Sequence, residues 1–281
     1  YVRKGNNHNN DIWGFAYNPT HMAGLQVFFQ AFLNGNTLIR LFGQNKESIL
    51  SLINRYKISH LSATPTFYRL LLPADQKLVS VKRITSGGEK FDDHACKQLS
   101  AIFPNAKITN VYASTEAGTL FATQGDIFSI KEEMKHLIKI ENNLLYLHRS
   151  LMGESTAIEL DGEWYNTGDL IEIISEFPFK FKFVSRQNEM INVGGYKVNP
   201  TEVEQAIREL SAVQDVFVYG KKNSVLGNVI CSEVISSSSL LSEVYIREYL
   251  KTHLQEFKIP RIIKFVNSIT TTRTGKIDRK K

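Results

Sequence analysis

Strand-like and helix-like segments alternate along residues 1–125, and this alternation limits the possible folds more than any other feature of the sequence. Thr20 is placed to cap a helix that ends at Gly35, and Thr64-Pro65 is placed to open another, because threonine caps helices and proline fits their first turn. The strand-like runs occupy residues 37–42, 58–63, 81–85 and 107–112. Strands joined through helices usually run parallel. The pattern therefore predicts a layered α/β subdomain with largely parallel strands over residues 1–125.

Two further segments have different patterns. Residues 126–187 alternate apolar and polar side chains with period two and contain turns such as Asp161-Gly162, which is typical of an antiparallel sheet or a small β-barrel-like region. Residues 188–281 combine strands with helices, one of them expected to be capped by Ser239, and predict a small α+β domain. The fold class that we expect is therefore α/β.

Composition excludes several classes of protein. Apolar residues make up 42% of the chain and charged residues 22%, a globular balance, and no apolar run is long enough to span a bilayer. Two cysteines, Cys96 and Cys231, are too few for a disulfide framework or a zinc site, and we expect free thiols in a reducing cytoplasm. The net charge is +6, but five basic residues and one acid lie in residues 273–281, so we expect no nucleic-acid partner.

Two polar, glycine-containing segments follow strand-like runs. In Thr85-Ser86-Gly87-Gly88-Glu89, the paired glycines let a flat ligand approach the backbone, or they only reverse the chain; taken alone, the second explanation is favoured. In Asn110-Val111-Tyr112-Ala113-Ser114-Thr115-Glu116, two hydroxyls and a carboxylate suit phosphate oxygens and Mg²⁺, and Tyr112 can stack on a base. A Ser/Thr-rich surface turn explains this second segment equally well.

Two later segments are also open to two interpretations. Asp169 follows a glycine at the start of an apolar run, where an acid accepts hydrogen bonds from ribose hydroxyls or from its own turn. Lys276, in Thr274-Gly275-Lys276, can deliver a point charge to a phosphate oxygen, although single lysines of this kind are nearly always solvated.

Six motifs occur together in one order. They are residues 64–71, Gly87-Gly88-Glu89, Tyr112-Ala113-Ser114-Thr115-Glu116, residues 165–170, residues 185–188 with 194–204, and residues 274–279. In this combination the chain resembles the superfamily of adenylate-forming enzymes, which includes acyl-CoA synthetases, peptide-synthetase adenylation domains and firefly luciferase. The order and spacing of the six motifs are very specific for the superfamily and only weakly specific within it.

The resemblance implies a ligase reaction in two half-steps. A small carboxylic acid attacks the α-phosphate of ATP, with Mg²⁺, to give an acyl-adenylate and pyrophosphate, and a thiol then displaces AMP. The residues 191–198 are more typical of CoA ligases than of peptide synthetases, so we expect CoA as the thiol. A separate carrier protein bearing phosphopantetheine is the alternative acceptor. A non-catalytic nucleotide-binding pseudoenzyme is the alternative from another class.

The resemblance also implies roles for individual residues. The implied catalytic residues are Lys276, which bridges the carboxylate and the α-phosphate, Thr115, the Mg²⁺ ligand Glu116, and His21. His21 is equally explained as a histidine at a helix N-terminus. The implied nucleotide-binding residues are Gly87, Gly88, Glu89, Asn110, Tyr112, Ala113, Ser114, Thr115, Asp169 and Arg186. The implied thiol channel contains Gly194, Gly195, Tyr196 and Lys197.

The resemblance further implies a division of the chain. Residues 1–187 correspond to the C-terminal part of a large domain, and residues 188–281 to a mobile lid domain that rotates about a hinge near Asn188. Ala113 replaces a usual glycine, Ser185 replaces another, and Asn188 stands where an acid is typical. The family's phosphate loop would lie upstream of Tyr1, so we expect this 281-residue piece to adenylate poorly by itself.

Overall fold

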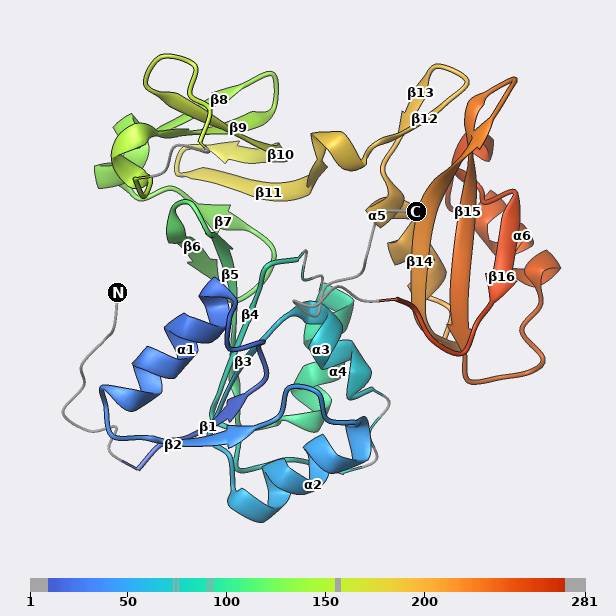
Figure 1. Ribbon diagram of the computed structural model, residues 1–281. Helices are drawn as coiled ribbons and strands as arrows, with labels where there is room; N and C mark the ends of the chain where they lie inside the picture. Colours follow the sequence, from blue (N-terminus) through green and yellow to red (C-terminus); the bar gives the residue numbers. More distant parts are fainter. Residues whose placement is uncertain are drawn as a thin grey trace. The chain divides into compact units, whose positions relative to one another are not determined.

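The computed structural model describes residues 10–72, 74, 76–89, 91, 93–154 and 158–270 (Figure 1). The described residues form two compact units. The first unit contains residues 10–167 and 171–183, and the second contains residues 168–170 and 184–270. Each unit has a hydrophobic core of its own.

A six-stranded sheet forms the centre of the first unit. Its strands are β1 (Ile12–Phe15), β2 (Thr37–Arg40), β3 (His60–Ala63), β4 (Arg83–Gly87), β5 (Lys107–Ser114) and β6 (Gly118–Thr123), in the order β2-β1-β3-β4-β5-β6. The first five strands pair in parallel, as the alternation predicted, and β6 is antiparallel to β5. The antiparallel part of the chain therefore begins at β6, before the predicted residue 126.

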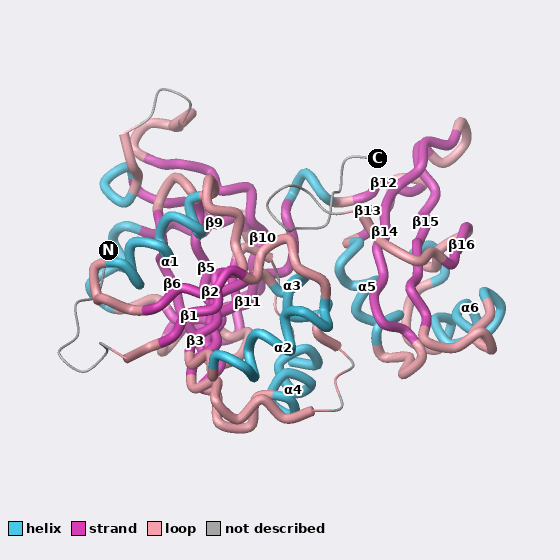
Figure 2. The backbone as a smooth tube through the Cα atoms, turned by 60° about the horizontal axis from the view of Figure 1, so that its bottom comes forward, coloured by secondary structure: helices cyan, strands magenta, loops and turns pink. Residues whose placement is uncertain are grey.

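Four helices cover this sheet. They are α1 (Met22–Phe32), α2 (Lys46–Tyr56), α3 (Pro65–Leu70) and α4 (Asp93–Ile102). Figures 1 and 2 show α1 on one face and the other three on the opposite face. Leu41, Ile53, Leu61, Ile84 and Phe103 are buried in the core on the face that carries α2, α3 and α4.

Helix capping agrees with the sequence at α3 and disagrees at α1. The Thr64 hydroxyl accepts the Phe67 amide and Pro65 occupies the first turn, as predicted. The prediction that Thr20 caps α1 is wrong, because the cap position is His21. The Thr20 hydroxyl instead donates to Oδ1 of Asn18, so it is used before the helix begins.

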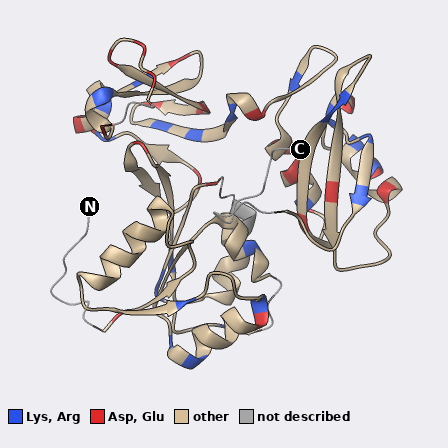
Figure 3. Ribbon diagram, in the orientation of Figure 1, with Lys and Arg blue, Asp and Glu red and all other residues tan. Residues whose placement is uncertain are grey.

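Helix α1 contains no charged residue, as Figure 3 shows. Val27 and Ala31 are buried on the side that faces the sheet. The exposed side carries Met22, Leu25, Phe28, Phe29, Phe32 and Leu33. Among the described residues, none covers this side of α1. An exposed apolar stripe of this kind is typical of a surface that contacts another polypeptide.

A five-stranded antiparallel sheet accounts for the predicted β-rich region. Its strands are β7 (Phe128–Ser129), β8 (Ile138–Glu141), β9 (Leu144–His148), β10 (Trp164–Glu176) and β11 (Phe179–Arg186), in the order β7-β11-β10-β9-β8. Phe128, Leu145, Ile171 and Phe181 are buried in its core together with Phe121 of β6. Strands β10 and β11 each contribute three residues to the second unit, 168–170 and 184–186.

The second unit has the strands and helices of a small α+β domain, and it also includes residues 168–170 and 184–187, which lie before the predicted boundary at residue 188. Its strands are β12 (Ile191–Val193), β13 (Tyr196–Val198), β14 (Val213–Asn223), β15 (Gly227–Ser236) and β16 (Ile262–Phe265), and its helices are α5 (Pro200–Arg208) and α6 (Glu243–Lys251). The sheet order is β13-β12-β15-β14, and β16 pairs in parallel with β15. No helix among the described residues is long and apolar enough to cross a membrane.

The cap of α6 is Ser242, so the prediction of Ser239 is wrong. The Ser242 hydroxyl accepts the Tyr245 amide at 3.2 Å. The upstream serines Ser236 and Ser237 donate to the Ala212 carbonyl instead. These bonds join the end of β15 to the residue before β14, whereas Ser239 lies in a turn in which the Leu241 amide donates to the Ser238 carbonyl at 3.4 Å.

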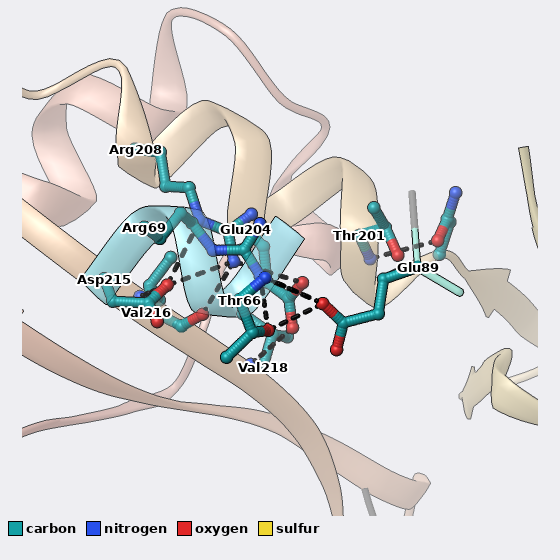
Figure 4. Close-up of polar contacts among 10 residues, drawn as sticks. Thr66, Arg69, Glu89, Thr201, Glu204, Arg208, Asp215, Val216 and Val218 are labelled. Atoms are coloured by element: carbon teal, nitrogen blue, oxygen red, sulfur yellow. Dashed lines mark hydrogen bonds and ion pairs between the residues drawn. The ribbon is translucent and has the colours of Figure 1, made fainter. Parts of the chain in front are cut away.

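A buried polar network fixes α5 to β14 (Figure 4). Glu204 is 1% exposed, and its Oε1 accepts the Val218 amide at 3.1 Å. Arg208 lies 3.6 Å from Glu204 and 3.4 Å from Asp215, and it donates to the Val216 carbonyl. Because a buried carboxylate is costly without partners, this network determines how α5 sits on the sheet.

We expect Glu204→Ala to lower the free energy of unfolding of the second unit by about 3 kcal/mol, because it leaves the buried Val218 amide unsatisfied and removes one of the two carboxylates beside Arg208. The matched control on the same helix is Glu202→Ala, which removes a more exposed ion pair with Lys258 and should cost at most about 1 kcal/mol. Hydrogen exchange of the β14 amides measures both effects. Equal losses in the two variants would contradict this assignment.

Candidate nucleotide site

The first two predicted motifs meet at one edge of the six-stranded sheet. Strands β4 and β5 are parallel neighbours, with Ser86 opposite Asn110 and Gly87 opposite Val111. Parallel neighbours end at the same edge, so the Gly87-Gly88 turn and the end of β5 lie side by side (Figure 1). In open α/β sheets, ligands bind beyond the carboxyl ends of parallel strands.

Both positions of the turn favour glycine, for different reasons. A Cβ at Gly87 would lie 2.6 Å from Cγ2 of Val111 and 3.1 Å from its carbonyl oxygen. Gly88 has φ +85°, in the region that favours glycine. The sequence therefore needs glycine at both positions for structural reasons alone: Gly87 packs on β5, and Gly88 has a positive φ. Because neither residue has a side chain, the backbone at this sheet edge is also bare.

Tyr112 is held by an aromatic residue that the sequence analysis missed. Its ring stacks on Phe183 of β11, with the centroids 4.3 Å apart and the planes inclined by 13°. Phe121 lies 5.7 Å from the same ring. The only sequence signal for Phe183 is the alternation of aromatic residues along β11. That alternation does not indicate that Phe183 contacts Tyr112. This stack fixes one face of the ring that we expect to contact a base.

The turn between β5 and β6 carries the candidate phosphate ligands. The Ser114 hydroxyl accepts the Ala117 amide at 3.0 Å, and the Glu116 carbonyl accepts the Gly153 amide at 2.7 Å. Thr115 is exposed and Glu116 is half-buried. Among the described residues, no side chain or backbone amide binds the Glu116 carboxylate. Ala113 lies beside an irregularity in the β5–β6 pairing, where its register partner is Thr119.

Two other predicted nucleotide-binding residues have internal partners. The Asn110 side chain is nearly buried, and its Nδ2 donates to the Gly125 carbonyl at 2.9 Å. The Glu89 carboxylate binds Thr66 at the start of α3 (Figure 4). Both side chains therefore brace the strands and turns that form the sheet edge.

Asp169 and Arg186 lie together within the second unit. Arg186 Nε donates to Oδ1 of Asp169 at 3.0 Å. The Asp169 side chain is 9% exposed, whereas that of Arg186 is 55% exposed. The preceding residue, Gly168, has φ +71°, which turns the chain before the carboxylate. These two residues, both among the implied nucleotide-binding residues, thus form one ion pair.

The hairpin of β12 and β13 carries the predicted thiol-channel residues. Gly194 and Gly195 have φ +58° and +90°, and Gly194 donates its amide to the Leu226 carbonyl. Tyr196 is 59% exposed and stacks on Phe257, with the ring centroids 4.4 Å apart. Lys197 is also exposed. The positive φ angles agree with the simpler explanation that these glycines shape a turn.

The remaining predicted residues are placed as follows. His21 is the half-buried N-cap residue of α1, and its side chain does not cap the helix. Asn188 is exposed in a 3-10 turn, η3 (Gln187–Glu189). Lys276 lies outside the described residues.

The described residues contain no group of three or more metal-binding side chains. The Glu116 carboxylate is suited to a Mg²⁺ ion that arrives with ATP, because Mg²⁺ in such sites takes one or two protein carboxylates and obtains its other ligands from phosphates and water.

We expect Gly87→Ala to lower the free energy of unfolding of the first unit by about 1–3 kcal/mol, because its new methyl group overlaps Val111. Gly153→Ala is the control, since its nearest atom would lie 3.4 Å away and its effect should stay within about 0.5 kcal/mol. Thermal unfolding of the two variants checks this. An unchanged midpoint for Gly87→Ala would show that the sheet edge can relax.

Comparisons with known proteins concern the family and the fold of the chain. Residues 2–138 match the model of the AMP-binding enzyme family, and residues 202–276 match the model of the AMP-binding enzyme C-terminal domain. A 2-succinylbenzoate--CoA ligase from Staphylococcus epidermidis is 25% identical over 97% of this chain and 61% of its own length. A 3,4-dihydroxybenzoate--(aryl-carrier protein) ligase from Bacillus anthracis is 26% identical over 89% of this chain and 58% of its own length.

A solved structure shares the fold. ATP-bound MatB from Rhodopseudomonas palustris superposes with a TM-score of 0.76 over 96% of this chain and 59% of that protein, at 18% identity. The chain therefore spans about three fifths of the length of the relatives that it matches. Because the two family models match most of the sequence in order and the fold agrees, the chain belongs to the AMP-binding enzyme family.

Proposed function

We propose that this chain is part of an AMP-forming acid–thiol ligase, which joins a carboxylic acid to ATP as an acyl-adenylate and then transfers the acyl group to the thiol of CoA. One observation carries the proposal. The bare Gly87-Gly88 backbone, the Tyr112 ring and the hydroxyl- and carboxylate-bearing turn 114–116 all come from the β4 and β5 ends of one sheet. A flat base, a phosphate chain and Mg²⁺ have complementary chemistry at this edge.

In this proposal the residues of the motifs take the following roles toward the nucleotide. Gly88 and Tyr112 enclose the adenine, and Thr115 donates to a phosphate oxygen. Glu116 binds the Mg²⁺ of the bound ATP. Asp169 accepts hydrogen bonds from the ribose hydroxyls, and its ion pair with Arg186 orients the carboxylate.

The first half-step brings a carboxylate to an anionic phosphate, so charge stabilisation dominates its energetics. Lys276 supplies that charge by bridging the carboxylate and the α-phosphate, and His21 lies near the acyl carboxylate. Both assignments rest on the sequence motifs. The carboxylate oxygen forms a bond to the α-phosphorus, the bond to pyrophosphate breaks, and no proton transfer is needed in this step.

The second half-step uses the domain that begins near the hinge, Asn188. In our proposal residues 188–281 rotate as a lid and present Gly194, Gly195, Tyr196 and Lys197 to the thiol. The exposure of the Tyr196 and Lys197 side chains is consistent with such a role, and Tyr196 also stacks on Phe257. The thiol sulfur then attacks the acyl carbon and AMP leaves.

A carrier-protein thiol is the second candidate acceptor. The relative from Bacillus anthracis is named as a ligase for an aryl-carrier protein, and it is as similar to this chain as the CoA ligase is. A nucleotide-binding protein without catalysis is the third candidate.

We expect the chain to bind AMP and Asp169→Asn to weaken that binding roughly tenfold or more, because hydrogen bonds to a charged group contribute about 1.5–3 kcal/mol. The partly exposed ion pair with Arg186 should contribute at most about 1 kcal/mol to folding stability. Glu172→Gln, an exposed acid of the same strand, is the control and should leave the affinity unchanged. Calorimetric titration with AMP measures both variants, and equal affinities would argue against the ribose assignment.

Acid-dependent ATP–pyrophosphate exchange tests catalysis. It should be measured with a chain of the relatives' full length and a panel of aliphatic and aromatic acids. We expect Lys276→Ala to reduce exchange by about 10²–10³-fold, as loss of a donor to developing charge does. Exchange that is followed by acyl transfer only with CoA would identify the acceptor. AMP binding without exchange for any acid would favour the non-catalytic alternative.

A further inference from the structure

Glu89 connects the Gly87-Gly88 turn to the beginning of α3. Its Oε2 accepts the Thr66 backbone amide at 3.0 Å and the Thr66 hydroxyl at 2.6 Å. Arg69, one turn later, donates from Nη2 to the Thr66 hydroxyl oxygen at 2.8 Å and lies 3.6 Å from Glu89 Oε2. Figure 4 shows the three side chains converging on one point.

In this contact, a residue from a distant part of the sequence accepts a hydrogen bond from a backbone amide at the N-terminus of α3. The first amides of a helix lack partners within the helix. In α3 the Thr64 hydroxyl accepts the Phe67 amide, and Glu89 accepts the Thr66 amide. The acid of a capping box normally comes from the helix itself, but here it comes from the turn after β4.

The surroundings of Glu89 strengthen the contact. The side chains of Glu89 and Arg69 are only 16% and 10% exposed, so solvent screens their attraction weakly. Burial raises the pKa of Tyr17, and the negative charge of Glu89 raises it further. The bonds of Glu89 to Thr66 and its attraction to Arg69 therefore lie in poorly hydrated surroundings, where hydrogen bonds are strong.

The turn needs such an anchor. Gly87 is fixed by its packing on Val111, and Phe91 is buried in the core. Between them, Gly88 has the positive φ that only glycine adopts easily, and glycine is the residue with the greatest backbone freedom. Glu89 holds the chain immediately after this flexible point.

We propose that Glu89 is a positioning residue, which acts on the nucleotide through the Gly87-Gly88 backbone by its bonds to Thr66, with Arg69 orienting the Thr66 hydroxyl. This inference deepens the proposed function and rests on it, because the turn matters for binding only if a nucleotide lies against it. The motifs assign no role to Thr66 and Arg69. In this proposal they help to hold the Gly87-Gly88 turn in the conformation that binds the nucleotide.

Two substitutions separate positioning from direct contact. Glu89→Gln keeps the shape of the side chain and removes its charge, and Thr66→Val removes the hydroxyl at the other end of the bond. We expect each to weaken AMP binding about five- to tenfold and the double variant to bind less weakly than the product of the two effects, because the bond from the Thr66 hydroxyl to Glu89 is common to both. Glu47→Gln, an exposed acid in the first turn of α2, is the control.

Hydrogen exchange gives a second measurement that needs no ligand. In Glu89→Gln and Thr66→Val, the amides of Gly88 and Glu89 should exchange about tenfold faster, while those of Leu61 and Ile84 in the neighbouring strands stay as in the original chain. Phe91 remains in the core, so both variants should fold.

The outcomes distinguish the two proposals. Unchanged exchange at Gly88 and Glu89 would overturn the positioning role whether or not AMP binds. Weaker AMP binding in Glu89→Gln alone, with Thr66→Val unaffected, would also overturn it and indicate direct contact with the nucleotide. If the original chain does not bind AMP while exchange behaves as expected, the anchor exists and the proposed function fails.

Discussion

The parallel pairing of β3, β4 and β5 is the constraint on which the candidate site depends. Parallel strands end at one edge, so segments far apart in the sequence are brought together there without any contact of their own. The pairing of Gly87 with Val111 shows how little space this leaves, because even one methyl group on Gly87 would overlap β5. The absence of a side chain at Gly87 therefore lets β4 and β5 pair closely. At the same edge, it leaves backbone that a ligand can reach.

Each unit contains a carboxylate that is shielded from solvent and is stabilised by hydrogen bonds to the backbone or to a hydroxyl. Glu89 accepts an amide and a hydroxyl at the start of α3, and Glu204 accepts the Val218 amide beside Arg208. Both residues belong to motifs that also contain candidate ligand-binding residues. A motif match therefore does not tell which of its residues touch a ligand and which hold the others in place. The distinction depends on the hydrogen-bond partners, which only the folded structure supplies.

The sequence predicted element types better than element ends. The strands at 107–112 and 58–63 and the helix opened by Thr64-Pro65 were found where expected, because period and local capping chemistry identify them. Thr20 and Ser239 failed as caps. In the first case the Thr20 hydroxyl donates to Asn18, and in the second Ser239 lies in a turn closed by the Leu241 amide on the Ser238 carbonyl, so Ser242 is the cap of the helix. Such competition between hydrogen-bond partners is not visible in a propensity pattern.

By itself, the sequence determined the α/β class, the order of the motifs and membership of the AMP-binding enzyme family, because periodicity and short glycine- and hydroxyl-rich segments are local properties of the chain. Only the tertiary structure decided that Phe183 supports Tyr112, that Glu89 anchors on Thr66 and that Glu204 joins α5 to β14. Each of these contacts joins residues that are separate in the sequence. Their pairing follows from how strands and helices pack, and that packing is a property of the whole core rather than of any one segment.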